Sequence, residues 1–141
     1  MLSSAVTSQN ILLILKPWLE REKDKIVALY GFGSFFSGEF NAESDIDLAI
    51  LTTEKIVPLV RWAWQNEFAN ILYHSVDLVD LMSASTVMKA QIIGSSQRLF
   101  CQDETRCNFF ETYVLSSYAR FNESRQELMK DIFERGSVYG R

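Results

Sequence analysis

The residues best suited to chemistry lie in the first third of the chain. Gly33-Ser34 is separated by ten residues from Asp45-x-Asp47, which opens the apolar run 48–51. Alternate residues of a β-strand point to the same side, with Cα atoms about 6.5–7 Å apart. Two carboxylates placed in this way beside an apolar strand repel each other and resist ionisation. Mg²⁺ would relieve that cost, because it prefers oxygen ligands and keeps water and phosphates in its shell. Taken alone, the pair is also compatible with solvated residues at a strand start.

A third carboxylate is expected on a neighbouring strand. The run 75–81 contains Asp77 and Asp80, which lie three residues apart and therefore on opposite faces of a strand. Only one of them can share a site with Asp45 and Asp47. Asp77 lies inside the apolar run and is assigned to the metal site, whereas Asp80, shortly before Ser83, is expected in a turn or capping role.

Gly33 and Ser34 follow a predicted strand and precede a predicted short helix. Glycine lets the backbone approach a phosphate closely, and the serine N–H and hydroxyl can donate hydrogen bonds to its oxygens. Other phosphate or ion motifs fail: the dinucleotide fingerprint lacks its third glycine, no Gly-Lys-Ser/Thr of a P-loop occurs, and the offsets of a calcium-binding EF-hand are absent. The segment therefore predicts a site for a nucleoside triphosphate and its metal ions.

The apolar periodicity predicts a small α/β (α+β) domain with a mixed sheet flanked by helices. Apolar residues on the predicted last helix recur along one side, at Phe110, Val114, Phe121, Leu128 and Ile132, together with Ser117. Gly94 and Gly136 are expected to end the last two helices. Predicted helices span about 8–24, 35–36, 54–70, 86–93 and 108–135, and predicted strands span 25–30, 45–52 and 75–81.

The length and net charge of the chain disfavour some classes of function. The 141 residues carry a net charge of −4, and their Lys and Arg residues form no cluster. Proteins that hold long nucleic acids usually show a basic face, so extended RNA or DNA is not the expected ligand. One domain, residues 1–141, is expected. The short apolar run 11–15 is neither a signal peptide nor a membrane span, and Cys101 and Cys107 are expected to be ordinary thiols, so the expected location is the cytoplasm.

The combination of Gly33-Ser34, ten residues, Asp45-x-Asp47 and a later Asp77 strand resembles the signature of the DNA polymerase β-like nucleotidyltransferases. The small size of the chain and the runs 44–48 and 76–81 resemble the minimal branch of that superfamily. That branch includes the MntA-type antitoxins, which are encoded beside HEPN-domain toxins of the HepT type.

The resemblance implies a polymerase β-like fold and a reaction. ATP is the implied substrate and two Mg²⁺ ions the implied cofactor, and AMP would pass to a tyrosine of a cognate HEPN toxin, the partner in a hetero-oligomer. By matching positions, Gly33 and Ser34 would hold the triphosphate. Asp45 and Asp47 would bind both ions, and Asp77 would bind the catalytic ion and help to take up the acceptor proton.

One residue departs from the pattern, and two other functions stay open. Many relatives carry arginine directly after Gly-Ser, where this chain has Phe35, while Gly38 is kept. A cation for the triphosphate would then have to come from another position.

The alternatives to the implied adenylyltransferase function are an antitoxin that acts by occlusion alone, and a transferase for a hydroxyl of a small molecule or an RNA.

Overall fold

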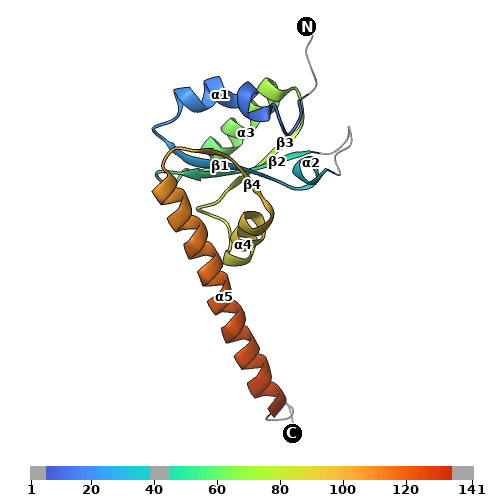
Figure 1. Ribbon diagram of the computed structural model, residues 1–141, viewed down its shortest axis with the longest axis vertical. Helices are drawn as coiled ribbons and strands as arrows, with labels where there is room; N and C mark the ends of the chain where they lie inside the picture. The colour runs from blue at the N-terminus through green and yellow to red at the C-terminus, as the bar shows by residue number, and fades with distance from the viewer. Residues whose placement is uncertain (1–5, 39–44, 135–141) are drawn as a thin grey trace.

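The computed structural model describes residues 6–38 and 45–134, and these form a mixed α/β fold around one sheet (Figure 1). Four strands lie in the order β3-β2-β1-β4. The pairings of β1 with β2 and with β4 are antiparallel, whereas β2 and β3 are parallel. The strands are β1 (Ile26–Phe32), β2 (Ile46–Thr52), β3 (Val76–Asp80) and β4 (Gln97–Cys101). The predicted small mixed sheet is confirmed.

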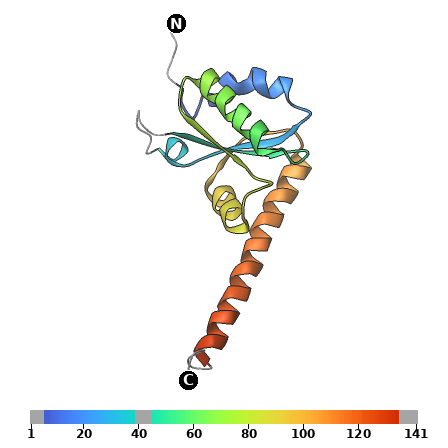
Figure 2. The same cartoon turned by 180° about the vertical axis from the view of Figure 1, so that it is seen from behind.

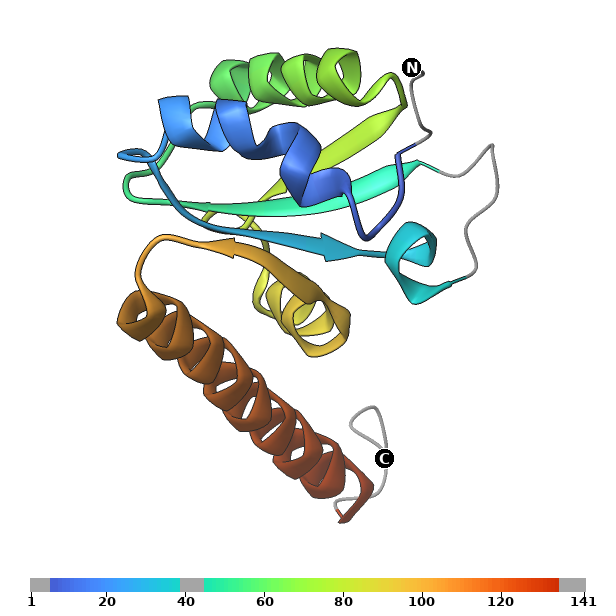
Figure 3. The same cartoon turned by 45° about the horizontal axis from the view of Figure 1, so that its top comes forward.

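Helices cover both faces of this sheet. One face packs against α1 (Ile11–Arg21) and α3 (Pro58–Leu72), which lie side by side above the strands in Figure 3. The other face packs against α4 (Thr86–Ser95) and the start of α5 (Glu104–Glu134). Between β1 and β2 stands the one-turn helix α2 (Ser34–Ser37). Because side chains alternate along β2, Ile46, Leu48 and Ile50 enter the core under α1 and α3 while Ala49 and Leu51 face α4 and α5.

The structure corrects the predicted element pattern in several places. Helix α3 begins at Pro58, four residues after the predicted start, since proline fits the first turn of a helix. Strand β4 was not predicted, since its five residues include exposed Gln97 and half-buried Arg98 and it pairs with a distant partner, β1. Helix α4 continues through Gly94 to Ser95. Helix α5 begins at Glu104, four residues before the predicted start, and the predicted end at Gly136 lies outside the described residues.

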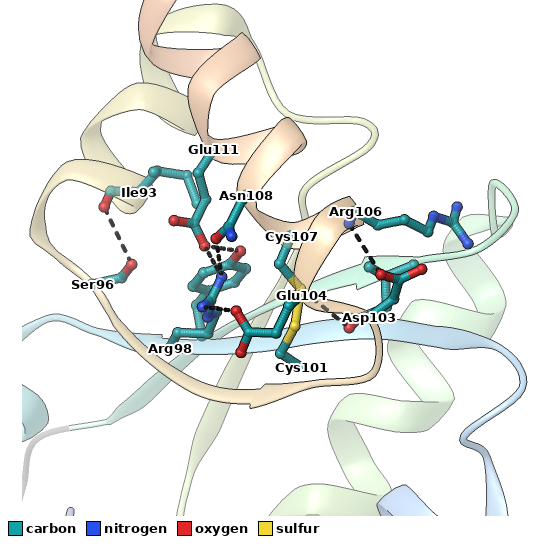
Figure 4. Close-up of polar contacts among 12 residues, drawn as sticks. Ile93, Ser96, Arg98, Cys101, Asp103, Glu104, Arg106, Cys107, Asn108 and Glu111 are labelled. Atoms are coloured by element: carbon teal, nitrogen blue, oxygen red, sulfur yellow. Dashed lines mark hydrogen bonds and ion pairs between the residues drawn. A yellow bond between two sulfur atoms is a disulfide. The ribbon is translucent and has the colours of Figure 1, made fainter.

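A polar network attaches the first turns of α5 to the sheet (Figure 4). Tyr30 of β1 is 1% exposed and donates a hydrogen bond of 2.8 Å to the carboxylate of Glu111. Arg98 of β4 donates to the same carboxylate at 2.9 Å and pairs with Glu104 at 3.1 Å. Burial, followed by the hydrogen bond from Tyr30 to the charged Glu111, raises the pKa of the Tyr30 hydroxyl. The Tyr30 hydroxyl therefore stays protonated and donates to α5 at any physiological pH.

The two cysteines lie in the same region and correct a second expectation. Cys101 at the end of β4 and Cys107 in α5 are joined by a disulfide, with their Cα atoms 6.6 Å apart (Figure 4). The prediction of two ordinary thiols is therefore wrong. The chain turns back after β4 and brings the first turns of α5 over the strand end, a juxtaposition that the spacing of six residues does not reveal. No helix among the described residues is long and apolar enough to cross a bilayer.

Candidate functional site

The three predicted carboxylates lie at one end of the two parallel strands. Asp47 and Asp77 are paired directly in the register of β2 and β3. Asp45 comes just before β2, two residues from Asp47, and is exposed. Asp47 lies two residues before Ala49, and Asp77 lies two residues before Val79, so each pair shares one face of its strand. Ala49 and Val79 pack on the α4 and α5 side, and the two carboxylates therefore face that side as well. The strand phase inferred from the sequence is what brings these side chains together.

Asp47 is the most constrained of the three. It is half-buried, whereas Asp45 and Asp77 are exposed. Burial and then the negative charges of Asp77 and Asp45 raise the pKa of Asp47 above its ordinary value of 3.8. The fold thus holds a carboxyl group where ionisation is unfavourable unless a positive charge is near.

The donor set suits a hard cation such as Mg²⁺. All three groups supply carboxylate oxygens, and a nearby cation would offset both the burial and the repulsion that raise the pKa of Asp47. Within residues 6–38 and 45–134, no three His, Cys, Asp or Glu side chains are already arranged to hold a metal ion. Because Asp45 and Asp77 are exposed, their side chains are free to rotate toward an ion that brings phosphate and water ligands with it. The assignment of these residues to a metal therefore stays a prediction.

Gly33 makes the turn beside Asp47. It has φ +80°, a conformation that side chains with a Cβ rarely adopt, and its carbonyl accepts hydrogen bonds from the N–H groups of Phe36 and Ser37 at 3.2 and 3.1 Å. A Cβ on Gly33 would collide with Oδ2 of Asp47 and lie 3.2 Å from its Cγ. Since Phe32 is paired with Asp47, the Gly-Ser turn and the carboxylates share one end of the sheet.

Phe35 has a packing role in this arrangement. Its side chain is 5% exposed and belongs to the core under α1 and α3, and its ring contacts that of Phe36 edge-on at 5.0 Å. Phe36 in turn covers Gly31, where a Cβ would overlap the phenyl ring. The two aromatic residues hold the single turn of α2 against the end of β1. The residue directly after Gly33-Ser34 is therefore an apolar anchor in this chain.

Asp80 takes the turn role expected for it. Its carboxylate accepts hydrogen bonds from the N–H of Met82 at 3.0 Å and from the hydroxyl of Ser83 at 2.9 Å. It is 8% exposed and lies on the face of β3 opposite to Asp77. Asp80 therefore stabilises the chain as it leaves β3 and does not share the face of the other three carboxylates.

A cavity of about 480 Å³ opens beside Gly33. Phe32 and Gly33 line one side of it. The other side is lined by the N-cap residue of α4, Ser85, and by the α4 residues Val87, Met88, Gln91, Ile92 and Ser95. Pockets of about 300–1,000 Å³ are typical of small-molecule sites. These α4 residues were not predicted from the sequence, because no local motif marks them and only the packing of α4 on the sheet brings them to Gly33.

A second cavity of about 480 Å³ lies at the other end of the sheet, lined by Val27, Thr52, Met82 and Phe110 among others. None of the predicted site residues borders it, so we do not assign it to the nucleotide.

The family model of polymerase β nucleotidyltransferases matches residues 15–105, about two thirds of the chain. The chain therefore belongs to the polymerase β nucleotidyltransferase family. Among curated proteins it resembles the protein adenylyltransferase MntA of Shewanella oneidensis. The two are 32% identical over 108 residues, a match that covers 77% of each chain.

Solved structures of nucleotidyltransferases of this family also resemble this chain in fold and sequence. A toxin–antitoxin complex with AMP-PNP contains a chain with a TM-score of 0.75 and 30% identity, over 86% of this chain and 98% of that one. A complex of the tri-AMPylated HEPN toxin of Shewanella oneidensis with its MNT antitoxin matches with a TM-score of 0.70 and 29% identity, over 89% and 98% of the two chains. These likenesses confirm the predicted polymerase β-like fold.

Replacement of Gly33 by alanine tests the contact with Asp47. A residue forced to φ +80° is strained by about 1–3 kcal/mol, and in Gly33→Ala the contact with Asp47 adds to that strain. Gly38→Ala is the control for a positive φ: Gly38 has φ +91° with ψ 2°, a milder left-handed conformation than the ψ of −169° at Gly33, and a Cβ there meets nothing within 4 Å. We expect Gly33→Ala to lower the free energy of unfolding more than Gly38→Ala in urea titrations. Equal losses would contradict the contact.

Asp47→Asn tests the electrostatics of the site through stability. Because the folded protein raises the pKa of Asp47, the stability that the protonated carboxyl confers is present below pH 3.8 and is lost as pH rises through the folded pKa. Without divalent metal at pH 7, Asp47→Asn should therefore melt at a higher temperature than the wild type. The difference should shrink as pH falls toward 4, and Mg²⁺ should stabilise the wild type more than the variant. A lower melting temperature of the variant at pH 7 would contradict the repulsion.

Proposed function

We propose that this protein is an antitoxin that neutralises a HEPN-type RNase toxin by transferring AMP from ATP to a tyrosine hydroxyl of that toxin. The observation that carries the proposal is the alignment of Asp47 with Asp77 on one open face of the sheet, next to the Gly33 turn. The likeness to a named protein adenylyltransferase over 77% of the chain supports the same reaction. Solved relatives in complex with an ATP analogue and with an AMPylated HEPN toxin support ATP as the donor and such a toxin as the partner.

Each predicted residue has a role in this reaction. Gly33 and Ser34 hold the triphosphate: the glycine leaves room for the phosphate, and the first N–H groups of a helix have no partner within the helix. The cavity between Gly33 and α4 has space for the nucleoside. Asp45, Asp47 and Asp77 would bind two Mg²⁺ ions. Mg²⁺, when bound, neutralises charge on the triphosphate and on the leaving pyrophosphate and favours ionisation of the acceptor hydroxyl.

The reaction exchanges one phosphoryl bond for another. The oxygen of the acceptor hydroxyl attacks the α-phosphorus of ATP, the bond from that phosphorus to the bridging oxygen breaks, and pyrophosphate leaves. The proton of the hydroxyl passes to Asp77, which is exposed on the side from which an acceptor protein would approach. Asp47, half-buried between its neighbours, fixes the ligand set in place and takes no proton while a cation holds it ionised.

Neutralisation by occlusion alone is the second candidate. The buried Phe35 favours it, because the position after Gly-Ser contributes no charge to a bound triphosphate. The carboxylate pair argues against it, since a protein that only binds its partner has no need of repelling charges at the edge of its core.

The double variant Asp45→Asn/Asp47→Asn distinguishes these candidates. Metal ions contribute several kcal/mol to transfer reactions of this kind, so the variant should modify the toxin at least about 10³-fold more slowly. Intact-mass spectrometry of a HEPN toxin incubated with ATP and Mg²⁺ measures the addition of AMP. Asp24→Asn, at an exposed residue away from the site, serves as the control. Normal modification by the double variant would overturn the metal-site assignment, and toxin neutralisation without any added AMP would favour occlusion.

A further inference from the structure

Among residues 6–38 and 45–134, none covers the second half of α5. Helix α5 contains 31 residues, of which Cys107 and Val114 are buried, and no described residue after Val114 is buried. At 1.5 Å per residue, the stretch 115–134 is about 30 Å long. Figures 1 and 2 show this stretch leaving the body of the protein beyond α4.

The apolar seam that attaches α5 to the domain continues along this uncovered stretch. From Val114 onward, side chains recur at alternating spacings of four and three residues, the spacing of helices that pack along their length. We call these residues the distal stripe: Tyr118, Phe121, Arg125, Leu128 and Ile132. Phe121 is 44% exposed and Leu128 is 59% exposed, and Met129 beside them is 45% exposed. The stripe therefore points along the same side of α5 as the residues that pack on the domain.

A helical stretch of this length has low stability in water when no other element packs against its apolar side. Isolated helices are marginally stable, and most helical stability in proteins comes from packing of an apolar face. The ion pair between Lys130 and Glu134, 3.9 Å apart, lies on the exposed surface of the stretch and contributes little to its stability. Exposed apolar side chains in a row at this spacing indicate a surface that another helix covers.

The charge of Arg125 indicates the chemistry of the helix that covers the distal stripe. It lies at the centre of the distal stripe, and among the described residues no carboxylate forms an ion pair with it. A guanidinium that is covered needs a carboxylate partner. A second copy of this chain, related by a two-fold axis through the middle of the stripe, would bring Arg125 against its own counterpart. The charge pattern thus fits a different protein, whose apolar helix carries Asp or Glu opposite Arg125.

The position of the stripe connects it to the carboxylate site. Helices α4 and α5 pack on the face of the sheet toward which Asp47 and Asp77 point. A protein held along the distal stripe therefore lies on the catalytic side of the sheet. An acceptor hydroxyl on that protein would approach Asp77 from the face on which Asp77 is exposed.

We propose that the distal stripe of α5 is the docking surface for the protein that accepts AMP, a HEPN toxin that presents an apolar helix with a carboxylate facing Arg125. This inference rests on the function proposed above. Docking supplies the affinity for the partner, and the carboxylates supply the chemistry, so the two parts can be separated by mutation.

Single substitutions to glutamate test the docking surface with matched charges. Phe121→Glu and Leu128→Glu alter the stripe, while Ser116→Glu and Gln126→Glu add the same charge at exposed positions off it. The probe is the HEPN toxin that the proposed function assigns to this chain as its cognate partner, and its affinity is measured by titration calorimetry without ATP. The stripe variants should bind it about thirtyfold or more weakly, because central apolar residues dominate interface energies, and the controls should bind as the wild type does. Arg125→Glu should weaken binding more than Arg120→Glu, its counterpart off the stripe.

The outcomes separate docking from chemistry. All stripe variants should keep the wild-type affinity for AMP-PNP and the wild-type helical content, since the altered side chains are exposed. Wild-type toxin affinity in Phe121→Glu and Leu128→Glu would overturn the docking proposal, whether or not the toxin is modified. A dimer of the isolated chain that Phe121→Glu dissolves would also overturn it, in favour of a second copy. Loss of binding in the stripe variants, with no AMP transfer by the wild type, would leave docking supported and overturn the proposed function alone.

Discussion

The parallel register of β2 and β3 is the constraint on which the rest of the site depends. It sets Asp47 beside Asp77, and burial, followed by the charges of Asp77 and Asp45, raises the pKa of Asp47. The apolar residues on the other face, Ile46 and Leu48 of β2 and Leu78 of β3, hold the two strands together by burial in the core. Burial of that face offsets the repulsion between the carboxylates, so the fold keeps two like charges side by side until a cation arrives.

The carboxylate face and the long helix belong to one side of the molecule. Tyr30, in the middle of β1, donates to Glu111 of α5, and Arg98 of β4 binds the same carboxylate. These contacts fix the direction in which α5 leaves the sheet. A rigid base and an uncovered distal half suit a helix that positions a large protein substrate, whereas a small-molecule transferase gains nothing from such an extension.

The sequence predicted the parts of the site that depend on strand phase. Alternation along β2 placed Asp45 and Asp47 on one face, and the three-residue spacing separated Asp77 from Asp80, which the structure confirms through the turn contacts of Asp80. The edge strand β4, the cavity wall of α4 and the disulfide were missed, because each depends on contacts between distant segments that no local pattern records. The role of Phe35 as a buried anchor likewise appears only in the packed structure.

Metal binding by the three carboxylates is the central requirement of the proposed reaction. A crystal structure with AMP-PNP and Mn²⁺, recorded at the manganese edge, tests this most directly, since Mn²⁺ replaces Mg²⁺ at oxygen sites and gives an anomalous signal. We predict anomalous peaks within coordination distance of Asp45, Asp47 and Asp77, with the triphosphate at Gly33 and Ser34. A triphosphate bound elsewhere, or bound at Gly33 with no metal peak at Asp47 and Asp77, would contradict the account.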